Sequence, residues 1–537
     1  MAGTFVEHPV IVPGSLEERA YQRTIAHHAL RENLLIVLPT GLGKTAIAIR
    51  VMAQYLQEDP RRAVLFMAPT RPLVEQHARF VQETLKVPPP VVWTGVLTPG
   101  RRQVGSLEGK VVVATPQVIA NDLASGSLDI TQFSLIVFDE VHRATGNYPY
   151  VAIADAYRNS SAGRILGMTA SPGNSLEKIR EVMDALSVRP SGLEVRDGAE
   201  EDVGRYIHGV QIEQVHVDAP QNLLDAARLL RDSLDRTARA LQDSGYLSSR
   251  ENVTRRTLLD AGARLRSAVE GHRMRGEKIP PGIWQAVSRQ SVAMKLTHAI
   301  ELIETQGIDS LERYIDRMTK ESKSRSPSTR MFLGDANVQL ALEALRQAKS
   351  EHPKIAEAVR LVKDEILWRQ GAKVILFTHY RDTADIMVHQ LLALHEPQIV
   401  PARFVGQASH GKEDAGLSQK EQVRILEDFK EGRINCLVAT SVAEEGLDIP
   451  ATDLVIFYEP VPSEIRTIQR RGRTGRSRAG RVVLLLTRGT QDVSTHFSAR
   501  GKESRMKRLI EQLKEDARGS VPRKAAGQTK LDSYAPD

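Results

Sequence analysis

The chain has 537 residues, and a usual domain size of about 100 to 200 residues predicts three folded units rather than one hydrophobic core. Hydrophobic residues make up 41% of the chain, as in an ordinary globular protein, and no apolar run approaches the roughly 18 residues of a membrane-spanning helix, which excludes a helical membrane protein. The net charge of +7 makes a polyanionic partner plausible without identifying one, because 73 basic residues face 66 acidic ones.

Short apolar runs alternate with polar, helix-like stretches between residues 34 and 185, as in NLLIVLPT, AVLFMAPT, KVVVATP and SLIVFDE. The same alternation of apolar runs and polar stretches occurs after residue 370, in AKVILFTH, INCLVATS, TDLVIFYE and RVVLLLTR. Such runs are typical of parallel strands in an α/β sheet covered on both faces. We therefore predict two similar parallel-sheet domains, over residues 1–200 and 345–500. The single cysteine, Cys436, excludes a disulfide framework within one chain and is expected to be a packed core thiol.

The segment PTGLGKT, residues 39–45, joins a predicted strand to a predicted helix. Its glycines allow successive backbone amides to point inward and cradle phosphate oxygens. Its lysine would supply charge to the β and γ phosphates, and its last threonine a hydroxyl for Mg²⁺. The match is incomplete at Leu38, where the general pattern has its first glycine. The predicted ATP-binding residues here are Thr40, Gly41, Gly43, Lys44 and Thr45.

The run SLIVFDEVHRA places Asp139 and Glu140 at the mouth of a predicted strand. Asp139 would hold Mg²⁺ through water, and Glu140 would orient and deprotonate the water that attacks the γ phosphate. The alternative is an acidic loop after a core strand, and the upstream phosphate loop favours the catalytic interpretation. The two motifs together predict an ATPase that uses ATP and Mg²⁺.

The middle of the chain, residues 218–330, has few strand-like runs and strong helical periodicity, which predicts an all-helical insertion. Between residues 250 and 278 it carries a basic excess that includes Arg255 and Arg256. A solvated helix face is the alternative, but a basic excess on an insertion beside two α/β units favours phosphate contacts, so Arg255 and Arg256 are predicted to bind DNA. Residues 319–335 are Ser-rich and basic, and we expect a mobile linker there.

Two features stand near the end of the chain. The segment QRRGRTGR, residues 469–476, has four arginines that either bind a nucleic acid or act on ATP. Residues 515–537 are predicted to form a flexible tail, because large apolar residues are scarce there.

Seven segments occur in the order of the conserved motifs of superfamily 2 helicases, and the chain resembles that superfamily: PTGLGKT, APTRPLVEQH, ATPQVI, DEVH, TAS, TSVAEEGLDIP and QRRGRTGR. The upstream RAYQ is similar to the adenine-reading motif, with Gln22 facing the base. Further segments resemble the Hef/FANCM-type branch: ELIETQGIDSLERYI, HPKIAEAV, FTHYRDTA and GTQDVSTHFSARGKESRMK.

This resemblance implies two RecA-like domains with a thumb-like helical insertion, and 3′ to 5′ ATP-driven remodelling of forked and four-way DNA. The sequence departs from relatives at Val141, where they usually have alanine, and we expect little chemical effect. Some archaeal relatives continue into a nuclease with an E-R-K-x-x-x-D motif. No such motif stands in this chain, so we expect no DNA cleavage by this polypeptide.

The resemblance also implies roles for single residues. It aims Arg473 and Arg476 at the triphosphate, with Gln469 near the attacking water, and places Gly446 and Asp448 near the ribose. Residues that would couple the nucleotide state to domain closure are His142, Thr169 and Ser171. Residues that would touch the sugar-phosphate backbone without reading sequence are Arg71, Thr94, Gly95, Thr115, Thr378, Arg381 and Thr440.

Two other functions stay open. Dicer and RIG-I-like proteins share the helical insertion, so the chain is alternatively a duplex RNA translocase, although it carries neither an RNase III unit nor signalling domains. A junction-binding scaffold with a vestigial ATPase is the third hypothesis, and the presence of Lys44, Asp139, Glu140, Arg473 and Arg476 argues against it.

In the tail, Gln528, Leu531 and Tyr534 fall at the spacing of the peptide that docks on a PCNA-type sliding clamp, although the usual second aromatic is Ala535. A tail without a partner is the alternative. We expect an intracellular protein, cytoplasmic and nucleoid-associated in a prokaryote or nuclear in a eukaryote.

Overall fold

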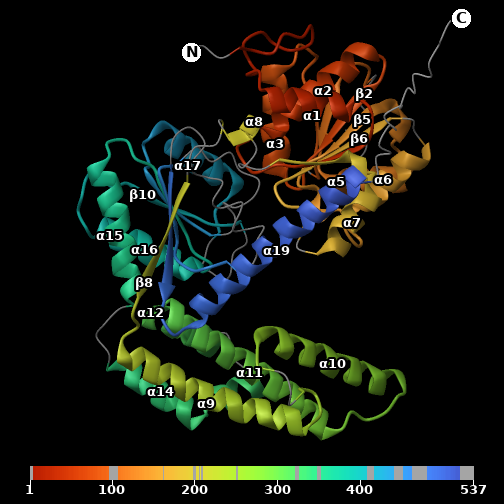
Figure 1. Ribbon diagram of the computed structural model, residues 1–537. Helices are drawn as coiled ribbons and strands as arrows, with labels where there is room; N and C mark the ends of the chain where they lie inside the picture. Colours follow the sequence, from red (N-terminus) through yellow and green to blue (C-terminus); the bar gives the residue numbers. More distant parts are fainter. Residues whose placement is uncertain are drawn as a thin grey trace, which may run out of the picture.

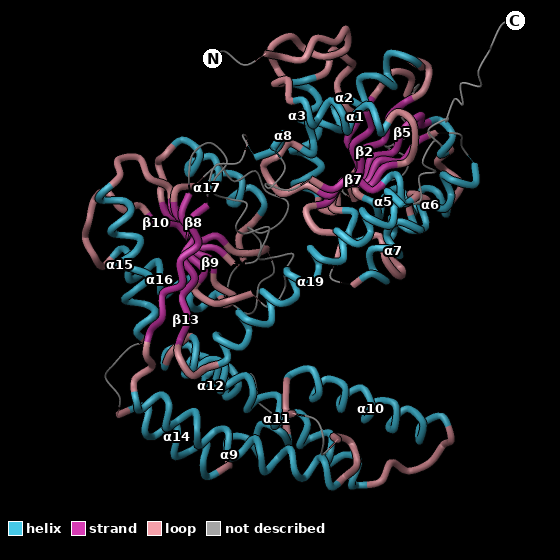
Figure 2. Tube along the Cα trace, in the orientation of Figure 1, coloured by secondary structure: helices cyan, strands magenta, loops and turns pink. Residues whose placement is uncertain are grey.

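The computed structural model describes residues 4–95, 107–160, 163–173, 175–196, 201–204, 206, 210–248, 252–320, 326–347, 352–407, 416–440, 452–461 and 480–519. These residues form two parallel-sheet domains and a helical bundle, which confirms the predicted fold class (Figures 1 and 2). In Figure 1 the first sheet domain is red to orange, the bundle yellow to green, and the second sheet domain teal to blue. No helix within these ranges is long and apolar enough to cross a membrane.

The first domain contains a seven-stranded sheet in the order β3-β4-β2-β5-β6-β1-β7, and all its strand pairs are parallel. Alternate residues of β1 face opposite cores, with Leu34 and Ile36 in one and Leu35 and Val37 in the other. Burial on both faces explains why these strands are continuous apolar runs. The strands are β1 Leu34–Val37, β2 Ala63–Met67, β3 Val91–Trp93, β4 Val111–Ala114, β5 Phe133–Phe138, β6 Arg164–Thr169 and β7 Leu193–Val195.

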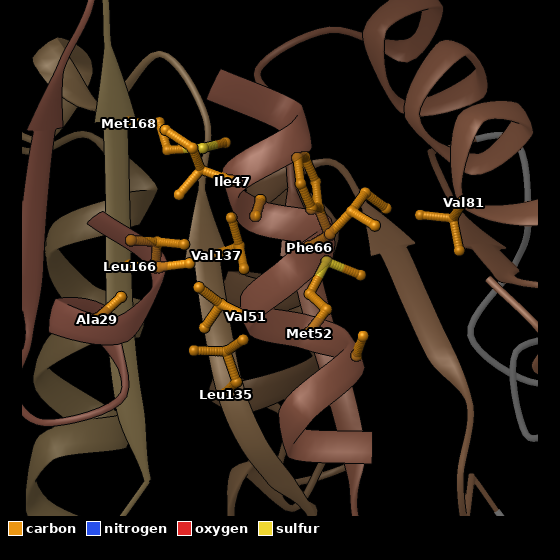
Figure 3. Packing of buried hydrophobic residues seen from close by; sticks show 14 of the residues in the cluster. Ala29, Ile47, Val51, Met52, Phe66, Val81, Leu135, Val137, Leu166 and Met168 are labelled. Atoms are coloured by element: carbon orange, nitrogen blue, oxygen red, sulfur yellow. The ribbon is translucent and has the colours of Figure 1, made fainter. Parts of the chain in front are cut away.

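Helices cover both faces of this sheet. Figure 3 shows Ile47, Val51 and Met52 of α2 against Phe66 and Val137 of the strands. The helices α1, α2 and α3 pack on this face, whereas α5, α6 and α7 contribute to the opposite core. Their bounds are α1 Ala20–Ala29, α2 Lys44–Glu58, α3 Arg71–Thr84, α5 Pro116–Ala124, α6 Pro149–Ser160 and α7 Leu176–Ala185, with α8 Glu201–Gly204 and the 3₁₀ turns η1 Ile130–Gln132, η2 Val141–Arg143 and η3 Pro190–Gly192.

The second domain contains a six-stranded parallel sheet in the order β10-β11-β9-β12-β13-β8. The core on one side is completed by α15 and α16, and the core on the other side by α17. Cys436 is buried in this sheet, as expected. The elements are β8 Val210–Val217, β9 Val374–Phe377, β10 Pro401–Phe404, β11 Cys436–Ala439, β12 Leu454–Phe457, β13 Gly480–Thr487, α15 Pro353–Trp368, α16 Arg381–Leu392 and α17 Gln419–Glu431.

The strand β8 precedes the helical insertion in the chain, yet it pairs with β13 along its whole length, from Val210 opposite Gly480 to Val217 opposite Thr487. In Figure 1 this yellow strand lies in the blue-green sheet. The insertion therefore interrupts the second sheet domain instead of separating two complete domains. The predicted start of that domain at residue 345 is corrected accordingly, because β8 belongs to it.

The helical bundle is longer than predicted. The segment 319–335, expected to be a mobile linker, contains the end of α12 and the whole of α13, whose Phe332 is fully buried in the bundle core. The next helix, α14, also contributes to this core through Val338, Ala341 and Leu345. The bundle helices are α9 Gln221–Asp243, α10 Arg255–Met274, α11 Pro281–Thr305, α12 Ile308–Lys320, α13 Pro327–Leu333 and α14 Ala336–Arg346.

The last helix, α19 Gln491–Gly519, leaves the second domain and crosses to the first, as the long blue helix in Figure 1 shows. At its start, Asp492 forms a buried ion pair with Lys354 of α15. Further along, Met506 is buried in a core of the first domain. Residues 515–519, at the start of the predicted flexible tail, belong to this helix, and the rest of the tail lies outside the described residues.

Candidate active site

The phosphate loop follows β1 at the carboxyl edge of the first sheet. Gly41 and Gly43 have φ of 88° and 75°, in the left-handed region that glycine adopts without strain. Helix α2 begins at Lys44, so the positive end of its dipole and its free amides face the loop. The ammonium of Lys44 lies 2.9 Å from Leu38 O and 3.4 Å from Pro39 O, folded back over the loop. The loop thus has the form of a phosphate cradle.

A buried amide lies beside this loop. Gln22 Nε2 donates to Leu42 O at 3.1 Å, and Tyr21 Oη donates to the same carbonyl at 2.6 Å. Gln22 Oε1 is buried and accepts no hydrogen bond from the residues that the structure describes. A Cβ added at Gly43 would lie 2.5 Å from Gln22 Nε2, so a larger residue there would displace the end of the Gln22 side chain. A buried acceptor without a partner is costly unless a ligand completes it, which fits a site for the adenine amino group.

Asp139 and Glu140 lie just past the end of β5. Asp139 is buried, and its Oδ2 accepts from His77 Nε2 at 2.9 Å. Burial opposes ionisation of this carboxyl, but the hydrogen bond from His77 and the positive charges of His77 and Lys44 outweigh it and lower the pKa of Asp139. Glu140 has φ of 48°, a left-handed conformation that is strained for a residue with a side chain. The charge of Lys44 therefore acts on the very carboxyl that is predicted to hold Mg²⁺.

The residues predicted to couple nucleotide to domain closure lie in contact with one another. His142 Nδ1 is 3.2 Å from Thr169 Oγ1 and 3.3 Å from Glu140 Oε2. Thr169 Oγ1 donates to Ser171 O at 2.9 Å, and Leu38 at the base of the phosphate loop donates its amide to Thr169 O at 3.1 Å. Ser171 Oγ lies 2.7 Å from Met506 Sδ of α19. A chain of contacts thus runs from Glu140 to a helix that begins in the second domain.

The phosphate loop opens into a cleft between α3 of the first domain and α17 of the second. This cleft has a volume of about 780 Å³, and its lining includes Gly43, Thr45 and His77. Gln419 of α17 donates to Glu75 of α3 at 3.4 Å across it. The site residues of the first domain therefore face the second domain.

The predicted nucleic-acid contacts of the first domain gather at one edge of its sheet. Arg71 follows β2, Thr94 and Gly95 follow β3, and Thr115 follows β4, and these three strands are neighbours. The side chains of Arg71 and Thr115 are at least partly accessible, whereas that of Thr94 is buried.

The corresponding residues of the second domain are divided between surface and interior. Arg381 is partly accessible at the start of α16, and its guanidinium donates to Gly406 O at 3.1 Å. The side chain of Thr440 is buried, and that of Thr378 is buried completely, with its hydroxyl donating to Glu459 at 2.8 Å. In this conformation the Thr378 hydroxyl is covered and already bonded, and its contact with the sugar-phosphate backbone of DNA stays a prediction. In the insertion, Arg255 and Arg256 are exposed.

Several predicted residues lie outside the described residues. They are Gly446, Asp448, Gln469, Arg473 and Arg476 of the second domain, and Gln528, Leu531 and Tyr534 of the tail.

Sequence reasoning missed His77 and Met506. His77 lies in APTRPLVEQH on the buried side of α3, with Val74, Ala78 and Val81. A polar residue among apolar ones at helical spacing was a usable signal for it. Nothing in the local pattern around Met506 could show which domain it contacts.

Comparisons with known families divide the chain in the same way as the structure. Residues 11–174 match the family described as the res subunit of type III restriction enzymes, and residues 357–478 match the helicase conserved C-terminal domain. Residues 223–352 match a family described as the helical bundle of an ATP-dependent RNA helicase. The crystal structure of the Pyrococcus furiosus Hef helicase domain is 40% identical, with a TM-score of 0.65 over 89% of this chain and 98% of that one.

The chain belongs to the Hef/FANCM-type superfamily 2 helicases. Among the curated relatives of this Hef/FANCM-type chain is a Methanocaldococcus jannaschii protein named as an ATP-dependent RNA helicase, 39% identical over 95% of the chain. Another is the ATP-dependent DNA helicase MPH1 of Coccidioides immitis, 34% identical over 93% of the chain. The chain spans 63% of the first relative and 47% of the second. Its helicase domains are those of an ATP-dependent enzyme.

Proposed function

We propose that this chain is an ATP-dependent DNA helicase or translocase that moves 3′ to 5′ and remodels forked and four-way DNA. The observation that carries the proposal is the arrangement at the sheet edge, where Lys44 and His77 act on Asp139 while Glu140 contacts the coupling histidine, His142. The name of the Coccidioides immitis relative, an ATP-dependent DNA helicase, supports DNA as the substrate. The exposed Arg255 and Arg256 support a duplex held by the insertion.

In the proposed reaction, the loop amides and Lys44 bind the phosphates of ATP, and Gln22 contacts the adenine. Bound Mg²⁺ would be held by Thr45 and Asp139 and would neutralise charge on the β and γ phosphates. Glu140 orients the attacking water and takes its proton. When the γ phosphate is lost, the contacts among His142, Thr169 and Ser171 would shift, and α19 and the second domain would shift with them.

The second domain would complete the site when the cleft closes. Arg473 and Arg476 would then stabilise charge on the transferred phosphoryl group, an effect that can supply about 10³ to 10⁵ in rate. Arg473→Ala is expected to retain DNA binding and lose hydrolysis. Loss of DNA affinity with DNA-independent hydrolysis retained would instead mark the arginines as a nucleic-acid patch.

A duplex RNA translocase is the second candidate, because one relative and the family matched by the bundle are named for RNA helicases. ATPase rates measured in parallel with fork DNA, plain duplex DNA and duplex RNA separate the two, with unwinding of labelled forks measured beside hydrolysis. We expect the strongest stimulation with forks. Strongest stimulation by RNA would replace the DNA proposal, and a Lys44→Ala protein that still remodelled forks would favour a scaffold with a vestigial ATPase.

The sequence of the tail supports a second partner. We propose that Gln528, Leu531 and Tyr534 dock on a sliding clamp of the PCNA type. A peptide of residues 524–537 should bind the clamp of its own organism, and a peptide with Leu531 and Tyr534 replaced by alanine should not. Equal binding, or none, by both peptides contradicts the proposal.

A further inference from the structure

We call residues 378–383, which join β9 to α16 and include the first three residues of that helix, the turn. This turn carries the predicted DNA contact Arg381 and is held from several sides by the helical insertion. Figure 1 shows α12 and the end of α11 against the lower end of the second sheet domain, beside α16. The contacts there are made by buried polar groups. Buried hydrogen bonds of this kind hold the insertion and the second domain in one relative position. Any other position would leave buried donors or acceptors without partners, which costs free energy.

Glu459, two residues past β12, is the centre of these contacts. It is only 4% exposed. Its Oε1 accepts from Thr378 Oγ1 at 2.8 Å and from Gln306 Nε2 at 2.8 Å, and its Oε2 accepts the backbone amide of His379 at 3.1 Å. One carboxyl group of the second domain therefore binds both the DNA-side turn and the insertion.

Gln306, which follows α11, completes the link. It is 1% exposed. While its Nε2 donates to Glu459, its Oε1 accepts from Thr383 Oγ1 at 2.6 Å. Thr383 lies in the first turn of α16 and is itself fully buried. The amide of Gln306 thus contacts Thr383, just after Arg381, directly, and it reaches Thr378 and His379, just before Arg381, through Glu459.

Two further contacts flank the same turn. Asp382 forms an ion pair with Arg317 of α12 at 2.7 Å. Tyr380 packs against the bundle core, and its ring centroid lies 5.8 Å from that of His298 in α11. Burial of the Tyr380 phenol and the neighbouring charge of Glu301, with which it forms a hydrogen bond, raise its pKa. Of the six residues in the turn, Arg381 reaches in another direction, toward Gly406 of the second domain.

We propose that Gln306 and Glu459 are positioning residues that transmit the position of the helical insertion to Arg381. A duplex held by the insertion would thereby fix the strand-contacting turn of the second domain, and closure of the cleft by ATP would move insertion and turn together. This inference rests on the proposed function, since it concerns how branched DNA stimulates the ATPase.

A pair of substitutions tests this link. In Gln306→Glu, two carboxyl groups face each other in a buried site, so that they repel or one must take up a proton. In the double variant Gln306→Glu with Glu459→Gln, the amide and the carboxyl group exchange places. The amide introduced at position 459 can donate to the carboxylate introduced at position 306 and to Thr378 Oγ1, because a hydroxyl accepts as well as donates. The exchange therefore restores a donor facing an acceptor between positions 306 and 459, while the bond from Gln306 Nε2 to Thr305 Oγ1 at 2.9 Å and the donation by the Thr378 hydroxyl to position 459 are lost.

The measurement is the ATPase rate with saturating fork DNA divided by the rate without DNA. We expect Gln306→Glu to lower this ratio about fivefold or more, the lower end of usual coupling between sites, while the rate without DNA stays near that of the wild type. The double variant should recover the ratio. A merely structural role would lower the folded fraction and reduce both rates together, and the ratio would not change.

Ser233→Ala is the matched control, because it removes a buried hydrogen bond inside the bundle, 2.5 Å from Ser233 Oγ to Asp335, away from the turn. Its ratio should equal that of the wild type. An unchanged ratio in Gln306→Glu, a double variant that fails to recover, or an equal loss in Ser233→Ala overturns the inference. Failure of the proposed function is separate, since it would appear as a wild-type protein that forks do not stimulate.

Discussion

The imidazole of His77 lies against the carboxyl of Asp139, with 2.9 Å between Nε2 and Oδ2, and both side chains are nearly excluded from solvent. This contact joins α3 to the end of β5. The same helix carries Arg71 at its start and Glu75, which meets Gln419 of the second domain. If DNA or the second domain moved α3, His77 would therefore move with it and displace the carboxyl of Asp139, which is predicted to hold Mg²⁺.

Replacement of His77 by alanine should impair hydrolysis without unfolding the domain. The carboxyl of Asp139 would lose the partner that orients it, and loss of such a supporting group usually costs about 10- to 100-fold in activity or metal affinity. We expect lower kcat and a higher Mg²⁺ requirement in steady-state ATPase assays. His27→Ala, at an exposed position of α1, is the control. Wild-type Mg²⁺ dependence in His77→Ala would show that the contact has no catalytic importance.

Gln22 should govern base selection. Its unpartnered Oε1 can accept from the amino group of adenine, whereas guanine presents a carbonyl oxygen in that place. Gln22→Ala is expected to raise KM for ATP about tenfold, equivalent to about 1.4 kcal/mol, and to reduce discrimination against GTP. Competition between the two nucleotides measures both effects. Gln54→Ala, which removes an exposed bond to Glu58, should change neither.

Met506 should tie α19 to the first domain. Its side chain is buried, and removal of a buried methionine side chain usually costs about 2 to 5 kcal/mol. In Met506→Ala, amide hydrogen exchange in α19 should become faster, because the helix detaches more often. Met331→Ala, with a side chain that is 45% exposed, is the matched control. If amide hydrogen exchange in α19 stays at the wild-type rate, contacts other than that of Met506 hold the helix on the first domain.

Tryptophan fluorescence can report contact between the insertion and DNA. The chain has three tryptophans: Trp93 is buried, Trp284 at the start of α11 is 47% exposed, and Trp368 on the second domain is 90% exposed. In Trp368→Phe, Trp284 is the exposed reporter, and in the sequence it follows the exposed Arg273 and Arg275, at and just past the end of α10, by about ten residues. Fork DNA should quench its emission, since bases stack on aromatic rings. Quenching retained in Trp284→Phe would mean that another tryptophan reports the binding.

The buried His352 should make the protein acid-sensitive. Burial of the imidazole and the neighbouring charge of Lys354 lower the pKa of His352 from 6.5 to about 3. The unfolded chain takes up this proton near pH 6.5 and the folded chain does not until about pH 3, so the unfolded state binds more protons in between. The free energy of unfolding should therefore fall as the pH falls through this window, by up to about 1.4 kcal/mol per pH unit from this group.

Denaturant unfolding at several pH values checks the acid sensitivity. His352→Asn keeps an acceptor for the Lys354 amide at the start of α15 and should flatten the pH dependence. His389→Asn, at an exposed position, should leave the slope unchanged. A wild-type slope in His352→Asn would assign the acid sensitivity to other groups.

Local patterns were sufficient for the inner strands of both sheets and for the phosphate loop, whereas the edge strands β3, β7, β8 and β10 were not predicted. The strands β1 and β5 are apolar runs that end in functional loops, and the fold class followed from their repetition. The same method failed for β8, where the polar residues Gln211, Glu213 and Gln214 interrupt the apolar run, and where the partner strand is remote in the chain. It also could not show that the Thr378 hydroxyl is buried, because the contacts with Glu459 and Gln306 that cover it are tertiary contacts that no local pattern contains.

The place of β8 has a consequence for how the chain matures on the ribosome. Glu213 of β8 and its ion-pair partner Arg481 of β13 are 268 residues apart in sequence. The first sheet domain and the helical bundle can fold as they emerge, but β8 must wait, with an unpaired edge, until β13 has been made. Synthesis of β13 then closes the second sheet, and α19, which follows it in the chain, joins this sheet domain to the first domain. Slow or interrupted translation near residue 480 would leave β8 exposed to wrong partners, so the yield of folded protein should depend on how fast the segment from residue 218 to β13 is made.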